Sequence, residues 1–184
     1  MRIFVLAFSL FVVQPALFSQ TQDPWVIYNT PSEVHNKLGK YNGDFVLDVS
    51  MWMDTSKTPV VFNLLAVNRM ILEGRFLEIA QSGNMGNEVY KGLTTIGYNT
   101  SSKEYDLITI TNMGTGILAL AGKGDADMKT ANLTGEIFDP VKKKPIKVRQ
   151  KISFIDENNL LIENFDIYDG KKEKKTVEYR FKRK

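Results

Sequence analysis

The chain has 184 residues, a formal net charge of +3, one histidine and no cysteine. Without cysteine it can form no disulfide, no thiolate metal site and no cysteine nucleophile. With a single histidine it can form no histidine-clustered metal site, and any metal would have to be held by carboxylates. We expect neither a metal nor a cofactor.

The N-terminus is typical of a secretory signal peptide. A positive start is followed by residues 3–13, which are apolar apart from Ser9, and the run ends at Gln14. A membrane-spanning helix needs about 20 apolar residues, so we expect residues 1–19 to be cleaved. The alternative is an uncleaved N-terminal anchor. Cleavage would give an exported protein, periplasmic or secreted, with no remaining transmembrane segment.

One helix is predicted after an N-terminal loop over residues 20–30. Thr30 supplies a capping hydroxyl, Pro31 occupies the first helical position, and Glu33 completes a capping box. An apolar stripe with helical spacing follows, formed by Val34, Leu38 and Tyr41. We expect a short amphipathic helix that ends before Gly43.

From Gly43 onward, apolar residues alternate with a period of two, as in strands that bury one face. Short turn signals separate the segments, and short connections make neighbouring strands antiparallel. After a first strand from Gly43 to about Met53, nine more are expected near residues 60–71, 75–81, 88–98, 104–112, 116–123, 127–138, 146–155, 160–168 and 174–183. Residues 31–184 are therefore predicted to form one all-β domain, an antiparallel up-and-down β-barrel of about ten strands.

Closure of the barrel predicts a specific contact. A long meander exposes two edges unless its last strand pairs with its first, and an even strand count makes that pair antiparallel. Arg183 should then lie near Phe45, where a cation–π contact would contribute about 0.5–2 kcal/mol. The alternative is that Arg183 is a solvated terminal residue.

Three glycines, Gly86, Gly92 and Gly97, raise the question of a phosphate-binding loop. Such a loop leads into a helix and places lysine after its last glycine. Here Lys91 precedes Gly92 and the following residues favour a strand, which excludes this type of nucleotide site. We predict Gly92 and Gly97 to be bulges or corner bends of a closing barrel, and Gly86 to belong to a turn.

Positive charge gathers near the C-terminus, where residues 141–184 hold 14 Lys and Arg against 7 Asp and Glu. Most of these lysines flank turn signals, which favours solvated hairpin tips over a nucleic-acid site. An outer surface that includes Trp52 or the hairpins at 142–151 and 171–175 is the candidate for a protein partner or an anionic envelope component.

Two polar residues are candidates for a functional site. His35 can bind an anion or act as a general base, or it can simply pack the helix on the barrel end. Glu163 lies beside Leu161 and Phe165; if it points inward, burial should raise its pKa unless it is paired, but an outward Glu163 fits as well. There is no G-x-S-x-G nucleophile elbow, and no catalytic residue is assigned.

The order and spacing of several short segments resemble the DUF1579 family, from about Pro31 to Arg183. The matching segments are Pro31 to His35, Leu72 to Leu77, Met85-Gly86, Gly97 to Asn99, Thr115-Gly116, Leu133 to Gly135 and Phe181 to Arg183. The resemblance implies a lipocalin-like (calycin) barrel with no assigned activity. Gly43-Asp44-Phe45 stands in place of a Gly-x-Trp pattern, and Thr109 and Thr111 stand where relatives often carry tryptophan and aspartate.

The predicted function is non-catalytic binding of a small apolar or amphipathic ligand inside the barrel. The residues expected to line the ligand site are Phe45, Leu47, Val49, Met51, Tyr98 and Phe181. Alternatively, these bulky side chains fill the interior and leave a dry core. A surface interaction module is the second hypothesis and an enzyme of unknown class is the third.

Overall fold

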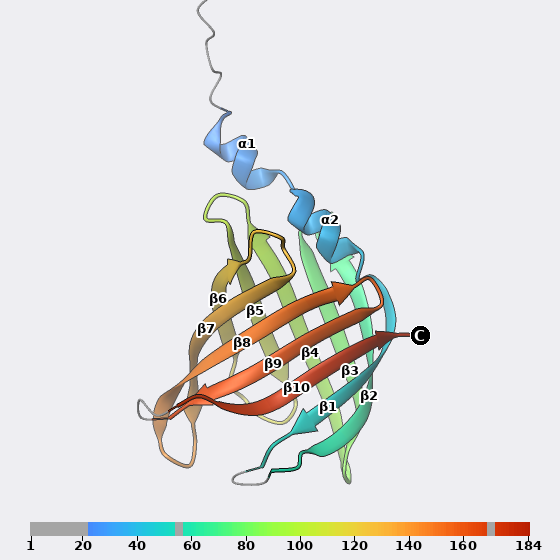
Figure 1. Cartoon of the computed structure of the whole chain (residues 1–184), viewed down its shortest axis with the longest axis vertical. Coiled ribbons are helices and arrows are strands. Elements are labelled where there is room, and N and C mark those ends of the chain that lie inside the picture. The colour runs from blue at the N-terminus through green and yellow to red at the C-terminus, as the bar shows by residue number, and fades with distance from the viewer. Residues whose placement is uncertain (1–21, 54–56, 169–171) are drawn as a thin grey trace, which may run out of the picture.

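A computed structural model describes residues 22–53, 57–168 and 172–184 of the chain (Figure 1). The predicted signal peptide, residues 1–19, lies outside these residues. Within them, two short helices precede ten strands. The helices are α1 (Pro24–Asn29) and α2 (Glu33–Gly39). The strands are β1 (Gly43–Met51), β2 (Val60–Ile71), β3 (Phe76–Met85), β4 (Glu88–Asn99), β5 (Glu104–Thr111), β6 (Leu118–Gly124), β7 (Thr130–Asp139), β8 (Lys144–Asp156), β9 (Asn159–Ile167) and β10 (Lys174–Arg183).

The strands form a closed antiparallel barrel, as predicted. Each strand pairs with its neighbours in the sequence, and β10 completes the ring by pairing with β1. At this seam Phe45 pairs with Arg183 and Val49 with Tyr179. The Arg183 guanidinium lies 4.7 Å from the centre of the Phe45 ring, so the predicted cation–π contact is present.

The two ends of the barrel differ. The helices lie at one end (Figure 1), and beneath α2 four aromatic rings pack with centroids 5.0 to 5.9 Å apart. These rings belong to Tyr41, Tyr98, Tyr105 and Phe154. The other end is formed by hairpin turns, including those that join β3 to β4 and β7 to β8. The helical end is therefore closed by side chains.

The N-terminal segment departs from the prediction in two ways. Residues 20–30 are not all loop, because Asp23 accepts the backbone N–H of Trp25 at 2.8 Å and starts α1, in which no residue is buried. The next helix starts at Glu33, since the hydroxyl of Thr30 donates to the carbonyl of Val26 in α1. Neither helix, nor any other in the described part of the chain, is long and apolar enough to cross a membrane.

The prediction of bulges at Gly92 and Gly97 is wrong, because β4 pairs regularly through both residues. The irregularities lie instead between β8 and β9 and between β9 and β10. A Cβ atom at Gly97 would lie 2.8 Å from the ring of Phe76, and one at Gly92 would lie 2.6 Å from Oη of Tyr90. These glycines make room for aromatic side chains. A strand at this position also rules out the helix that a phosphate loop requires.

Candidate functional site

The end of the barrel opposite α2 opens into a cavity of about 790 Å³, which we call the mouth. It is lined by the ends of β1, β6, β7, β8, β9 and β10. Apolar side chains such as Met51, Ile137, Val148 and Val177 form much of its wall. Volumes of this size are typical of small-molecule sites, which are mostly apolar with a few placed polar groups.

A smaller inner cavity of about 130 Å³ lies between the mouth and the packed core. Leu118, Asn164 and Val177 line both spaces, so the inner cavity adjoins the mouth. Its lining is partly apolar and partly polar. The polar residues are Gln81, Thr94, Thr109, Gln150, Asn164 and Tyr179. An amphipathic molecule could therefore enter from the mouth and meet hydrogen-bonding groups at depth.

One wall of the inner cavity carries a chain of hydrogen bonds that starts at Tyr90. Burial raises the pKa of the Tyr90 hydroxyl, which donates to Oε1 of Gln81 at 3.1 Å. Nε2 of Gln81 donates to Oγ1 of Thr94 at 3.2 Å, and the hydroxyls of Thr94 and Thr109 lie 2.9 Å apart. Three neighbouring strands, β3, β4 and β5, thus place these groups in one line.

The facing wall carries a second chain, on β8, β9 and β10. Nε2 of Gln150 donates to Oδ1 of Asn164 at 3.2 Å, and Nδ2 of Asn164 donates to Asp166 at 2.8 Å and to Thr176 at 2.9 Å. Burial raises the pKa of Asp166, although hydrogen bonds from Thr176, Asn164 and Tyr168 oppose this. Oε1 of Gln150 is buried, and no residue in the described part of the chain is hydrogen-bonded to it.

The residues predicted to line a ligand site are distributed over three depths. Phe45, Leu47 and Val49 are fully buried in the core, and none of them is among the residues that line the mouth or the inner cavity. Met51 lines the mouth and Phe181 the inner cavity, whereas Tyr98 lies at the closed helical end. The packed core and the cavities therefore coexist.

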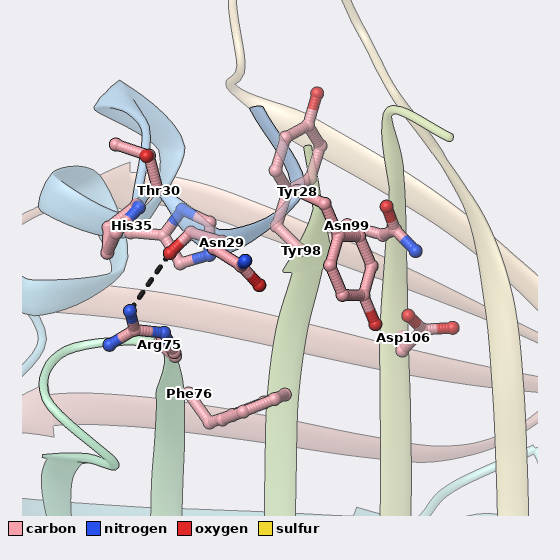
Figure 2. A pocket seen from close by; sticks show the side chains of 10 residues that line it. Tyr28, Asn29, Thr30, His35, Arg75, Phe76, Tyr98, Asn99 and Asp106 are labelled. Carbon is pink, nitrogen blue, oxygen red and sulfur yellow. Dashed lines mark hydrogen bonds between the residues drawn. The ribbon is translucent and has the colours of Figure 1, made fainter. Parts of the chain in front are cut away.

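His35 lies at the helical end, beside a surface pocket of about 230 Å³ (Figure 2). Its Nδ1 accepts the backbone N–H of Ser32 at 2.9 Å, so Nε2 carries the proton that bonds the carbonyl of Tyr98. Arg75 donates to the carbonyl of Asn29 at 2.9 Å. Nδ1 of His35 therefore caps α2 and Nε2 attaches the helix to β4, which favours the structural role that the sequence left open.

We expect stability to fall with acidification because of His35. Burial, and to a smaller extent the charge of Arg75, lowers the pKa of the His35 ring below 6.5, although the hydrogen bond to the Tyr98 carbonyl opposes this shift. The unfolded chain then binds more protons, so stability is lost as the pH falls through 6.5 toward the folded pKa. Denaturant unfolding at pH 7.5 and 5.0 measures this loss. His35→Gln, which keeps a capping acceptor but does not titrate, should show a smaller loss; equal losses would contradict the assignment.

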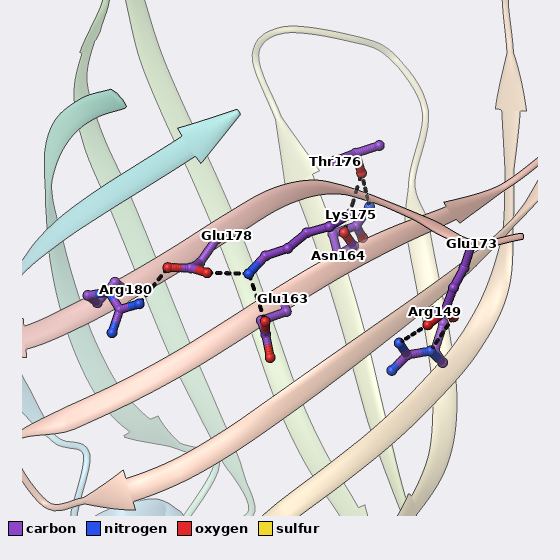
Figure 3. A network of polar contacts seen from close by, with 8 residues as sticks. All are labelled: Arg149, Glu163, Asn164, Glu173, Lys175, Thr176, Glu178 and Arg180. Atoms are coloured by element: carbon purple, nitrogen blue, oxygen red, sulfur yellow. Dashed lines mark hydrogen bonds and ion pairs between the residues drawn. The ribbon is translucent and has the colours of Figure 1, made fainter. Parts of the chain in front are cut away.

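Glu163 lies on the outer face of β9, which is the second of the two orientations left open (Figure 3). Nζ of Lys175 is 2.7 Å from Oε1 of Glu163 and also pairs with Glu178, which in turn pairs with Arg180. Nearby, Arg149 pairs with Glu173 at 2.6 Å. Glu163 is thus part of a surface ion-pair network, and the next residue, Asn164, is the one that faces inward.

Four inward polar residues of the inner cavity were not predicted from the sequence, although their parity marks them. Gln81 follows Ile79 by two positions, Gln150 stands between Val148 and Ile152, and Asn164 follows Ile162 by two. Thr94 likewise precedes the buried Ile96 by two. A polar residue at a core-facing position of an alternating strand is the signal that would have found them.

Among the described residues, no group of three His, Asp or Glu side chains is arranged to hold a metal ion. A family model described as a protein of unknown function, DUF1579, matches residues 30–183. No curated protein matches the chain at a significant level.

Proposed function

For this chain, which belongs to the DUF1579 family of proteins of unknown function, we propose that the barrel binds a small amphipathic molecule through its mouth. The observation that carries the proposal is that the apolar mouth adjoins an inner cavity lined by Gln150, whose buried Oε1 has no hydrogen-bond partner among the described residues. Buried polar atoms are nearly always partnered in folded proteins, so an unpaired one in a cavity wall suits a ligand contact.

Blocking the junction between the two spaces tests this proposal. Leu118 lines both cavities, so Leu118→Trp should weaken binding of the apolar fluorophore N-phenyl-1-naphthylamine by about tenfold or more. Fluorescence titration measures the affinity. The matched control is Ala119→Trp, because Ala119 is the next residue of β6 and is exposed. Equal affinity in all three proteins, or no binding to any of them, would refute the proposal.

Native mass spectrometry of the purified protein addresses the natural ligand and the processing of the chain together. A bound molecule should appear as an added mass on the protein that is lost on collisional activation. The fraction of protein that carries this mass should be smaller for Leu118→Trp. Export through a cleaved signal peptide remains part of the proposal, and the mass of the mature chain should then correspond to a start near Gln20.

The alternative of a surface interaction module has less support. Lys175 in the basic hairpin is paired with Glu163 and Glu178 and lies 5.1 Å from the ring of Trp52. Arg149 is paired with Glu173. These cations are therefore partly neutralised within the chain. Binding to an anionic surface would weaken steeply with added salt, because exposed charges are screened within about 10 Å at 0.1 M.

A further inference from the structure

The hydrogen-bond chain on β8, β9 and β10 determines which atom Gln150 offers to a ligand. A carboxylate only accepts hydrogen bonds, so Asn164 must turn its NH₂ group toward Asp166, which lies 2.8 Å away. Oδ1 of Asn164 is then left for Gln150, whose NH₂ group lies 3.2 Å from it. Asp166 therefore acts as a positioning residue that leaves Oε1 of Gln150 as a free acceptor.

That acceptor is well shielded from water. Gln150 is only 4% exposed, lines the inner cavity, and its Oε1 has no partner among the described residues. A buried acceptor without a partner is costly, and a donor that enters the cavity removes the cost. This wall therefore selects a ligand with an O–H or N–H group.

The opposite wall offers a donor. Thr94 accepts a hydrogen bond from Gln81, and its hydroxyl shares one contact with the hydroxyl of Thr109. These two hydroxyls carry two protons, and their mutual contact uses one of them. The remaining proton belongs to a residue that lines the inner cavity, whichever of the two donates. This wall therefore selects a ligand with an oxygen acceptor.

The uncharged lining of the inner cavity disfavours a ligand with an ionised head group. The described residues that line it include no Lys, Arg, His, Asp or Glu. An ionised group would lose its water there without gaining a counter-ion, which is strongly unfavourable. The cavity of about 130 Å³ has space for about four non-hydrogen atoms, at roughly 30 Å³ each. It thus fits a head group and the first carbons of a chain that continues into the mouth.

We propose that the ligand has an uncharged head group that both donates and accepts hydrogen bonds, as a primary alcohol or a primary amide does, on an apolar tail. This inference rests on the proposed function of the cavity. The head group lies between Gln150 and the Thr94–Thr109 pair, and the tail extends past Leu118 and Val177 into the mouth. Carboxylate amphiphiles of the same length bind more weakly.

Isothermal titration of the full chain at pH 8 with three probes that each carry a ten-carbon chain tests the head group. We expect 1-decanol to bind about tenfold more tightly than decyl methyl ether, which lacks the donor, and than decanoate, which is charged. Decanoate binding as tightly as decanol, or ether and decanol binding equally, would overturn the head-group inference while leaving binding in the cavity intact. If none of the probes binds, the proposed function fails as well.

Substitution of Gln150 assigns the acceptor. Gln150→Met should reduce decanol affinity about tenfold and leave ether affinity within twofold, so that the preference for alcohol disappears. Retained ether binding shows that the variant is folded. Lys151→Met places the same side chain at the next position of β8, on the outer face, and should bind all three probes like the native chain. A full alcohol preference in Gln150→Met would overturn the assignment.

Discussion

Replacing Arg183 by methionine is expected to lower the free energy of unfolding by about 4 kcal/mol. Its guanidinium donates to the carbonyls of Asn42 at 2.6 Å, Lys40 at 2.5 Å and Glu157 at 2.6 Å, and stacks on Phe45. One side chain thus ties the end of α2, the turn after β8 and the seam together. Denaturant unfolding followed by circular dichroism measures the loss.

Two variants make this prediction specific. Arg183→Lys should recover only a small part of the lost stability, because a single ammonium group cannot span three carbonyls. Arg180→Ala removes an arginine three residues earlier, whose side chain is 55% exposed and pairs with Glu178. Exposed pairs contribute at most about 1 kcal/mol, so Arg180→Ala should be nearly as stable as the native chain. If Arg183→Met lost no more stability than Arg180→Ala, the proposed role of Arg183 in tying these segments together would be contradicted.

Substitution of Gly122 by alanine is expected to destabilise the barrel by about 3 kcal/mol. A Cβ atom there would lie 2.0 Å from the carbonyl oxygen of Asn132 and 2.9 Å from the Cα of Leu133. Both are backbone atoms of β7, so no side-chain rotation relieves the clash and the two strands must separate. The midpoint of thermal unfolding should fall by roughly 5–10 °C.

Gly116 provides the matched control, since a Cβ atom there meets no atom within 4 Å. Gly116→Ala should change the stability by less than about 1 kcal/mol. Gly135 faces β6 in the same way, and a Cβ atom there would lie 2.3 Å from the carbonyl oxygen of Ala119. Gly135→Ala should therefore resemble Gly122→Ala. Tolerance of alanine at both sites would show that β6 and β7 do not approach as closely as described.

The architecture was predictable because it follows from local rules. A period of two with short connections forces an antiparallel meander, and unpaired edges make its closure favourable. The pairing of Phe45 with Arg183 follows from closure by an even number of strands, which brings the end of β10 beside the start of β1. The helix start was not predictable because Thr30 and Ser32 are both good caps, and the choice depends on the contact of Thr30 with α1.

The site was less predictable, for two physical reasons. Parity gives the face of a residue but not its depth along the barrel, so packed residues such as Leu47 and lining residues such as Phe181 have the same pattern. On β9 both faces carry apolar residues. Phe165 can lie on the outer face because the guanidinium of Arg149 covers it, 4.1 Å from its ring. This ambiguity drew attention to Glu163 rather than to Asn164.

The seam between β1 and β10 joins residues 45 and 183, whereas every other ladder joins consecutive strands. Because the chain is synthesised from its N-terminus, β1 has no second partner until β10 has been made. Until then the nascent sheet has two unpaired edges, which are sites for aggregation. Closure of the barrel thus depends on β10 (Lys174–Arg183), and a variant truncated before Lys174 would keep two unpaired edges and be prone to self-association.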